Sequence, residues 1–281
     1  MVFLIISIIA SSTMSIVIRL SQGRIRGKFS MLAANYLACI AAGLFYTDAG
    51  SLVRPGPGAG LALGLGIFNG ALYMVSLLIQ QQCIEKNGIT LSSAFQRIGG
   101  LLVPFVASVL FFRERPAILQ IMGAILAIGA IIAMDRKDKA GAAGSTLLLM
   151  LLFFADGTTG ITSKIYEELG APAFSNHFIS YTFMAAFICS VAVIILKKEK
   201  FGWTEVLFGV MIGIPNFFGT KTLLAALETV PGIVAYPVRS VSSLLVLSVA
   251  GLAVFRERLS KRQWYCIAAI VAAVALLSLG G

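Results

Sequence analysis

Residues 109–120, VLFFRERPAILQ, end one hydrophobic stretch and begin the next. Residues 254–263, VFRERLSKRQ, have the same arrangement in the second half of the chain. Phe112-Arg113-Glu114-Arg115 recurs as Phe255-Arg256-Glu257-Arg258, and Gln120 recurs as Gln263, at an offset of 143 residues. Because this offset is about half of the 281 residues, the sequence indicates a duplicated unit.

The composition places this duplicated unit in a membrane. Hydrophobic residues make up 58% of the chain and charged residues 12%, whereas soluble domains carry about a quarter charged residues. Several apolar runs reach the roughly 20 residues that a helix needs to cross a bilayer. We predict helices, because isolated strands cannot satisfy their backbone in lipid. The ten predicted spans are approximately 2–20, 30–47, 58–82, 89–112, 117–134, 146–165, 174–196, 204–227, 232–255 and 262–279.

Further matches between the two halves keep the same order along the chain. They include Tyr36 with Tyr181 (offset 145), Asn69 with Asn216 (offset 147) and Leu101 with Leu244 (offset 143). Residues 1–140 and 141–281 therefore form two predicted repeats of five spans each. Because five is odd, the second repeat must insert inverted with respect to the first. The predicted fold is all-α, with ten transmembrane helices in two inverted repeats around a central cavity.

Basic residues are concentrated in the loops on one side of the membrane. The loops after odd-numbered spans hold 14 Lys and Arg residues, and those after even-numbered spans, with one span end, hold 4. The positive-inside rule places the odd-numbered loops in the cytoplasm and both termini outside. This distribution also explains the net charge of +10 without a nucleic-acid partner.

Four charged residues fall well inside predicted spans, namely Arg97, Asp156, Lys221 and Arg239. Each costs about 2.5–3.5 kcal/mol at the centre of a span, so each is expected to face a cavity or a partner. Three cations and one acid suit a substrate that bears a carboxylate or a phosphate. Asp156 would bind a substrate amine, carry a coupling proton or neutralise a nearby cation. The alternative is that these charges pair with one another or snorkel to the membrane interface, and only hold the bundle together.

Polar groups within the spans are candidates for the same cavity, because an aromatic face and an amide together can hold a small polar metabolite. Hydrogen bonding between helices, or a belt at the membrane interface, is an equally good explanation for any one of them. The candidates are Tyr36, Asn69, Tyr73, Gln96, Tyr181, Asn216 and Tyr236. The halves differ at the counterpart pairs Gln96/Arg239, Arg97/Ser240 and Ser11/Asp156, where we expect substrate choice to be set.

Motifs for catalysis or for a bound cofactor are absent from the sequence. His177 is the only histidine, so a His-Glu-x-x-His zinc motif cannot form, and no GxxxxGK[ST] phosphate loop occurs. The four cysteines lie in or at the edge of apolar runs without CxxC or Cys/His spacing, which indicates neither a disulfide framework nor a metal site. We therefore expect that the chain is not an enzyme and that it binds neither a metal nor a cofactor.

The pattern as a whole resembles the drug/metabolite transporter superfamily, in its EamA-type branch. Two five-span halves carry the resemblance, each with a Phe-Arg-Glu-Arg turn between its fourth and fifth spans, together with Arg19 and Lys164 at the ends of the first spans. The resemblance implies an inverted-repeat bundle whose third, fourth, eighth and ninth spans line a substrate cavity. Members of the superfamily move amino acids, nucleosides, sugar phosphates and quaternary amines without ATP. They usually keep both termini inside, which is opposite to the orientation that the charges favour.

The leading hypothesis is a secondary active transporter that works by alternating access in the cytoplasmic membrane of a bacterium or archaeon. Its substrate would be an anionic or zwitterionic metabolite, such as an amino acid, an organic acid or a phosphorylated compound. The expected partners are the substrate, the lipid bilayer and a coupling proton or cation, and the expected state is a monomer. The alternatives are a transporter of cationic or neutral metabolites (a quaternary amine or a nucleoside), an intramembrane enzyme, or a membrane scaffold that transports nothing.

Overall fold

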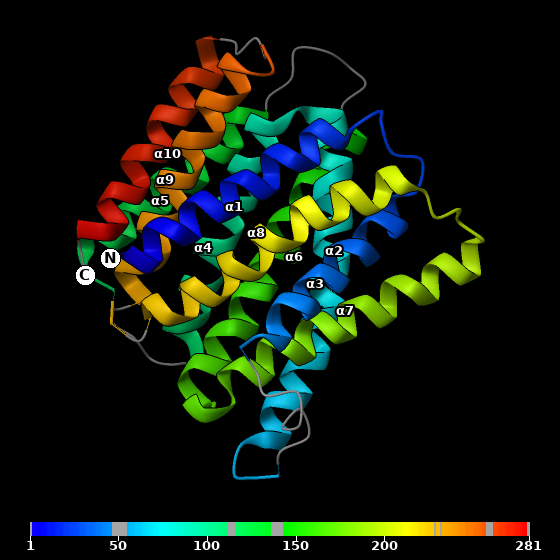
Figure 1. Cartoon of the computed structure of the whole chain (residues 1–281). Coiled ribbons are helices and arrows are strands. Elements are labelled where there is room, and N and C mark those ends of the chain that lie inside the picture. The colour runs from blue at the N-terminus through cyan, green and yellow to red at the C-terminus, as the bar shows by residue number, and fades with distance from the viewer. Residues whose placement is uncertain are drawn as a thin grey trace.

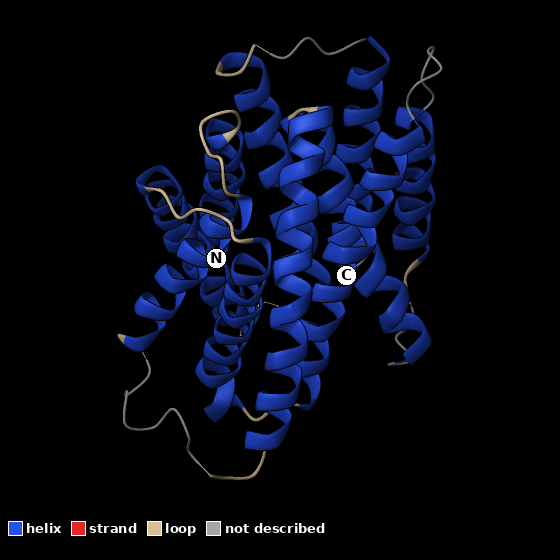
Figure 2. Cartoon of the chain, turned by 90° about the vertical axis from the view of Figure 1, so that its right-hand side faces the viewer, coloured by secondary structure: helices blue, strands red, loops and turns tan. Residues whose placement is uncertain are grey.

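The computed structural model describes residues 2–46, 55–111, 116–135, 143–227, 229–230, 232–256 and 261–279. These residues form helices and connecting turns, with no strand among them (Figures 1 and 2). The prediction of an all-α fold is therefore confirmed. The helices are α1 (Val2–Ser21), α2 (Lys28–Leu44), α3 (Ala59–Asn87), α4 (Ile89–Phe111), α5 (Ile118–Asp135), α6 (Ala143–Leu169), a short 3₁₀ helix (Pro172–Phe174), α7 (Ser175–Lys197), α8 (Trp203–Leu227), α9 (Gly232–Ala253) and α10 (Lys261–Leu279).

The helix ranges follow the predicted spans closely, except that α3 and α6 extend further. The predicted third span ends at residue 82, but α3 continues to Asn87 and stops at Gly88, which has φ 80° and ψ 168°. Only glycine adopts this conformation without strain, so Gly88 allows the chain to leave α3 and begin α4 at once. The repeated Phe-Arg-Glu-Arg turn cannot be compared between the halves, because residues 112–115 and 257–260 lie outside the described residues.

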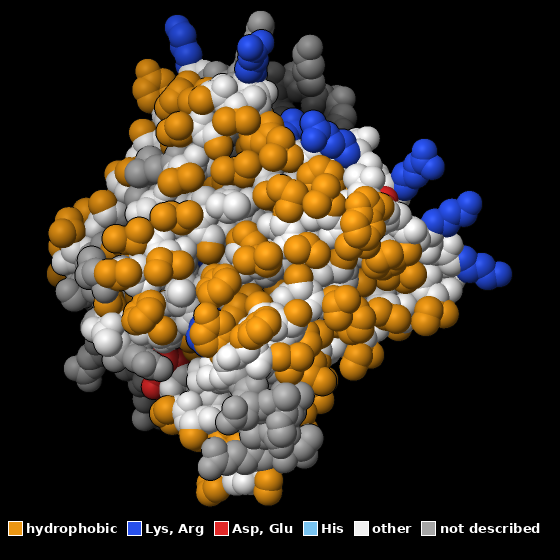
Figure 3. All heavy atoms as spheres, viewed as in Figure 1, with side chains coloured by type: hydrophobic (Ala, Val, Ile, Leu, Met, Phe, Trp, Pro, Cys, Tyr) orange, Lys and Arg blue, Asp and Glu red, His pale blue; other side chains and the backbone are white. Residues whose placement is uncertain are grey.

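Six helices of the described residues are long and apolar enough to cross a membrane. Helix α2 is also apolar but has only 17 residues, so its crossing and that of the remaining helices stay predictions. Large hydrophobic side chains are exposed on the outside of the bundle, where a bilayer would cover them (Figure 3). The chain is a multi-pass membrane protein. The six candidate spans are Val2–Ser21, Ala59–Asn87, Leu91–Phe111, Thr146–Leu169, Pro172–Lys197 and Trp203–Ala226.

Helices of the first half pack mainly against helices of the second half. Helix α3 packs against α6 and α7, and α8 packs against α1 and α2. Helix α4 contacts α6 and α9, α9 contacts α1, and α5 lies along α10 (Figure 1). When each of α1–α5 is exchanged for the helix five places later, this set of contacts maps onto itself. In this set, equivalent helices of the two halves therefore make equivalent contacts, which agrees with a duplicated unit.

Glycines allow the closest of these contacts between the halves. Gly66 and Gly70 of α3 lie against the backbone of α7, and Gly209 and Gly213 of α8 lie against the backbone of α2. A Cβ atom at any of these four positions would collide with the facing helix. Small residues at such contacts let helices pack by dispersion where lipid provides no hydrophobic driving force.

The two ends of the bundle are distinguished by their loop contacts. Glu205 Oε1 accepts hydrogen bonds from the backbone N–H groups of Arg26 and Gly27 at 2.7 and 3.2 Å, which joins the first turn of α8 to the α1–α2 loop. We call this end the α1–α2 face. At the opposite end of α2, Asn176 Nδ2 donates to the carbonyl oxygen of Tyr46 at 3.4 Å, and we call that end the α6–α7 face.

Basic side chains gather at the α1–α2 face. Figure 3 shows Lys and Arg side chains along the upper and right-hand rim of the molecule, and an apolar surface over much of the rest of this view. Helices α1, α7 and α8 reach this rim (Figure 1). The charge asymmetry seen in the sequence is therefore an asymmetry between the two ends of the folded bundle.

We expect Gly70→Ala to destabilise the protein, since the added Cβ would lie 2.7 Å from the Cβ of Ala185 and closer still to the carbonyl oxygen of Thr182. Overpacking of this kind costs about 1–3 kcal/mol. Gly64→Ala is the matched control on the same helix, because nothing lies within 4 Å of its added Cβ. Thermal unfolding in detergent measures the difference, and equal melting temperatures for the two variants would contradict the α3–α7 contact.

Candidate functional site

A polar cavity lies inside the bundle between α1, α3, α4, α6, α8 and α9. Its cavity volume is about 120 Å³, which is smaller than the roughly 300–1,000 Å³ of most small-molecule sites. Six of the predicted site residues line it, namely Tyr73, Gln96, Arg97, Asp156, Asn216 and Arg239. The contributing helices include α3, α4, α8 and α9, together with α1 and α6.

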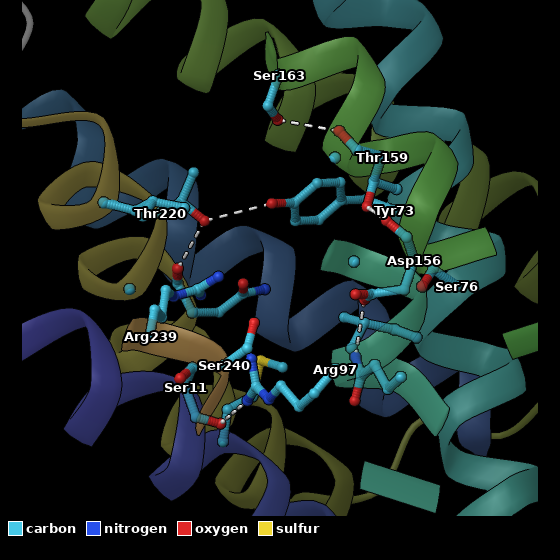
Figure 4. Close-up of a pocket in the computed structure, with 18 of the residues that line it drawn as sticks. Ser11, Tyr73, Ser76, Arg97, Asp156, Thr159, Ser163, Thr220, Arg239 and Ser240 are labelled. Carbon is cyan, nitrogen blue, oxygen red and sulfur yellow. Dashed lines mark hydrogen bonds between the residues drawn. The ribbon is translucent and has the colours of Figure 1, made fainter. Parts of the chain in front are cut away.

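Arg97 of α4 extends into the cavity and is 8% exposed. Its Nη2 atom donates a long hydrogen bond of 3.4 Å to the carbonyl oxygen of Ser11, and its Nε atom has no partner (Figure 4). Among the described residues, no ion pair joins Arg97 to a carboxylate. A buried guanidinium carries five donors, so most of the hydrogen-bonding capacity of Arg97 is available to a ligand.

Arg239 of α9 is the second guanidinium of the cavity and is only half-buried. Arg97 and Arg239 lie close enough to interact electrostatically. Like charges repel in a low-dielectric interior, and an anion between or beside them relieves that repulsion. The two arginines therefore give this part of the cavity a strong preference for negative charge.

Asp156 of α6 supplies the acid in the cavity wall. Its Oδ1 atom accepts a hydrogen bond of 2.9 Å from Gln96 Nε2, and Gln96 Oε1 in turn accepts one of 2.8 Å from Gln80 Nε2. Gly100 of α4 leaves room for the carboxylate, because a Cβ there would lie 2.5 Å from Asp156 Oδ2. The carboxylate also interacts electrostatically with Arg97 and Arg239. The cavity therefore presents cationic and anionic groups to the same small space.

Hydroxyl groups complete the wall, and most of them escaped the sequence prediction. Tyr73 and Thr220 approach each other across the cavity, with 3.5 Å between the tyrosine oxygen and Thr220 Oγ1. Thr159 and Ser163 of α6 lie one helical turn apart, with Ser163 Oγ donating to the carbonyl oxygen of Thr159 at 3.0 Å (Figure 4). The repeat contained a signal for Thr220, which is the counterpart of Tyr73 at offset 147.

The positions at which the two halves differ meet in this cavity. The structure brings all three counterpart pairs, Gln96/Arg239, Arg97/Ser240 and Ser11/Asp156, into its wall. Each pair matches a charged group in one half of the sequence with a neutral polar group in the other. That these positions set substrate choice stays a prediction.

Lys221 lies outside the cavity wall, although it follows a residue of that wall directly. Its ammonium group sits over the ring of Tyr46, 3.1 Å from the ring centroid, and 5.9 Å from the centroid of Phe217. The cavity face of α8 carries Asn216, Thr220 and others at spacings of three and four residues. One residue further along a helix is a rotation of about 100°, which turns Lys221 away from that face.

Three further candidates also lie elsewhere, and one cannot be placed. Tyr36 of α2 is fully buried and packs beside Phe183, with 6.3 Å between ring centroids. Asn69 of α3 is 2% exposed and does not line the cavity. Tyr181 of α7 lies near His177, with 6.2 Å between ring centroids. The side chain of Tyr236 is outside the described part of the chain.

Comparison with known proteins agrees with this architecture. Residues 144–279 match the EamA-like transporter family, which confirms the resemblance inferred from the sequence. An uncharacterized protein of Haemophilus influenzae is 24% identical over 292 residues, covering 98% of this chain and 96% of that protein. A solved crystal structure has the same fold with a TM-score of 0.67 at 16% identity, covering 99% of this chain and 96% of the other.

The burial of Arg97 without an ion pair leads to a prediction about stability. We expect Arg97→Met to raise the melting temperature in detergent, because it removes a desolvated charge whose cost reaches about 3 kcal/mol at a span centre. Arg24→Met, in the exposed α1–α2 loop, should leave the melting temperature unchanged. A lower melting temperature for Arg97→Met would mean that this charge holds the bundle together.

Proposed function

We infer that this chain, which belongs to the EamA-like transporter family over residues 144–279, is a secondary transporter of a small anionic or zwitterionic metabolite. One observation carries the proposal: Arg97, Arg239 and Asp156 share a polar cavity within the membrane bundle. Charges inside a bilayer are expensive, and they commonly mark the path of a substrate or an ion.

The two arginines are the proposed binding groups for a carboxylate or phosphate. A guanidinium offers paired donors in a planar fork that matches two oxygens of either group. Two guanidiniums side by side bind an anion more strongly than one, since the ligand also relieves their mutual repulsion. Asn216, Thr220 and Tyr73 provide uncharged donors and acceptors for the rest of the molecule.

Asp156 is the proposed partner of a substrate amine or the carrier of a coupling proton. Its Oδ1 is held by Gln96, while the carboxylate remains part of the cavity wall. A substrate with a carboxylate and an amine would satisfy the arginines and Asp156 together, which favours an amino acid over a simple organic acid. Proton coupling is the remaining role if the substrate bears no amine.

Two other classes of function fit the cavity less well. An intramembrane enzyme needs a nucleophile beside a base, and among the described residues that line the cavity there is neither a histidine nor a cysteine. A scaffold would have its charges paired and its interior filled. Arg97 has no ion pair among the described residues, and the cavity is open.

The proposed mechanism is alternating access by two inverted repeats, residues 1–140 and 141–281. Each contact described above between a helix of one half and a helix of the other has an equivalent contact when the halves are exchanged, which supports this proposal. The family match of residues 144–279 also covers almost the whole of the second proposed repeat. The ten helices would then all cross the membrane. Inverted repeats give two states of similar energy that expose the same site to opposite sides.

Localisation and orientation complete the proposal. The relative from Haemophilus influenzae is bacterial, which supports a bacterial cytoplasmic membrane for this chain as well. The basic α1–α2 face would lie in the cytoplasm and both termini outside, following the positive-inside rule. We propose that the protein acts as a monomer, since the cavity is built from one chain.

Transport tests the anion site directly. A thermal-shift screen of the purified protein against amino acids, organic acids, sugar phosphates and nucleosides first identifies a ligand for uptake into proteoliposomes. We expect Arg239→Gln to lower kcat/KM for that uptake by about tenfold to a hundredfold, since a charged hydrogen bond is worth about 1.5–3 kcal/mol. Arg24→Gln is the control, and unchanged uptake by Arg239→Gln would refute the site.

Neutralising Asp156 distinguishes the substrate classes. With Asp156→Asn, we expect stabilisation by amino acids to be lost, while stabilisation by organic acids or phosphates is kept or increased because a repelling charge is gone. Glu168→Gln, at the exposed end of the same helix, should change neither response. Unchanged stabilisation by amino acids would exclude the amine role, and selective stabilisation by choline would overturn the anionic assignment.

A further inference from the structure

Six buried polar residues lie on α1, α3 and α4, three helices that contact one another. Each of these helices contacts the other two, and the six residues are at most 1% exposed. We define the seam as Ser12 and Ser15 of α1, Gln80 and Gln81 of α3, and Ser92 and Ser93 of α4. These residues are distinct from those that line the cavity.

The polar atoms of the seam are left largely without partners. Ser12, Ser92 and Ser93 have unpartnered hydroxyl oxygens. Gln81 has no partner for either amide atom, and Gln80 has none for its Oε1. Native proteins rarely bury polar groups without hydrogen bonds, and lipid-embedded bundles have no bulk water to compensate. A seam of this composition fits a region that is wetted in another state of the protein.

The seam connects the cavity to the α1–α2 face. Gln80 Nε2 donates to Gln96 Oε1 at 2.8 Å, in the cavity wall, and to Ser15 Oγ at 3.2 Å, in the seam. At the other end, Gln22 Nε2 donates to the carbonyl oxygen of Gln81 at 3.2 Å. Gln22 follows α1 and precedes the basic α1–α2 loop. Hydrogen bonds therefore join the cavity wall to Ser15 at one end of the seam, and Gln22 to the backbone of Gln81 at the other.

The second half of the chain does not repeat this seam. The counterparts of Ser12 and Ser15 at offset 145 are Gly157 and Gly160, which pack against Val103 and Pro104 of α4. The counterpart helix α6 makes no comparable contact with α8 or α9 among the described residues. Instead, the cavity residues of α6, α8 and α9 are the more exposed ones, including Thr159, Ser163 and Thr220.

The cavity is therefore more exposed on its α6–α8–α9 side and closed toward the α1–α2 face by the seam. We propose that the seam is the closed half of the substrate path, and that its six side chains contact the substrate when α1, α3 and α4 separate. This inference rests on the proposed transport function. Hydroxyl and amide groups without charge suit a path that an anionic or zwitterionic molecule must enter and leave without being held.

Accessibility of substituted cysteines tests the seam without a known substrate. The native cysteines Cys39, Cys83, Cys189 and Cys266 are replaced by serine, and Ser12→Cys, Ser92→Cys and Ser93→Cys are introduced singly. Right-side-out and inside-out vesicles are treated with the impermeant reagent 2-(trimethylammonio)ethyl methanethiosulfonate. Arg24→Cys, in the exposed α1–α2 loop, shows which vesicles present that face.

We expect all three seam cysteines to react from the same face as Arg24→Cys, and Ser163→Cys to react from the opposite face. Ser190→Cys is the matched control, because Ser190 is a buried serine of α7 that donates to the carbonyl oxygen of Ala186. It should react from neither face. If the seam cysteines stay unreactive while Arg24→Cys and Ser163→Cys react, the seam is static packing and the proposal is wrong.

Reaction of the seam cysteines from the Ser163→Cys face would also overturn the proposal, since the seam would then belong to the open cavity. Neither result affects the anion site, which the Arg239→Gln variant tests separately. A second variant keeps the test valid if a cysteine variant misfolds. Gln81→Leu removes two unpartnered polar atoms from the seam. When it is added to the Ser92→Cys chain, we expect the melting temperature to rise and the cysteine to react about tenfold more slowly. An unchanged reaction rate would contradict a path that opens and is wetted.

Discussion

A polar group that faces hydrocarbon without a partner is too costly to keep, and this constraint organises the whole molecule. It requires helices, because only a helix or a closed barrel satisfies its backbone within lipid. It also requires that Arg97, Arg239 and Asp156 point inward, where they line the polar cavity instead of facing lipid. Both the apolar exterior and the inward-facing charges therefore follow from the lipid that surrounds the bundle.

Contacts between the two halves of the chain build the scaffold in which these charges are held. Helices of each half pack against the other half, and glycines of α3 and α8 bring the paired helices into backbone contact. The packing residues are similar in the two halves, whereas the cavity residues differ. Matching positions in the two halves of the sequence thus carry different groups in one cavity, with Arg97 matched to Ser240 and Asp156 matched to Ser11.

Hydrophobic runs predicted the helices well, because a span must be apolar over its whole length whatever it packs against. The same uniformity hides which side of a span faces the interior. Arg97 and Lys221 looked equivalent as charges within spans, yet Arg97 lines the cavity and Lys221 lies over Tyr46. Thr159 and Ser163 went unnoticed for the same reason, since a hydroxyl in a span is as common in packing as in a binding site.

The sequence by itself determined that the chain crosses a membrane, that similar motifs recur in the same order in its two halves, and that a few charges lie within apolar spans. These properties follow from composition and spacing, which do not depend on the rotation of any helix. Only the tertiary structure decided which polar residues meet. The rotation of each helix and the identity of its neighbours depend on close packing between distant segments. For this reason Tyr36 lies in the core, whereas Ser11, Gln96 and Asp156 line one cavity.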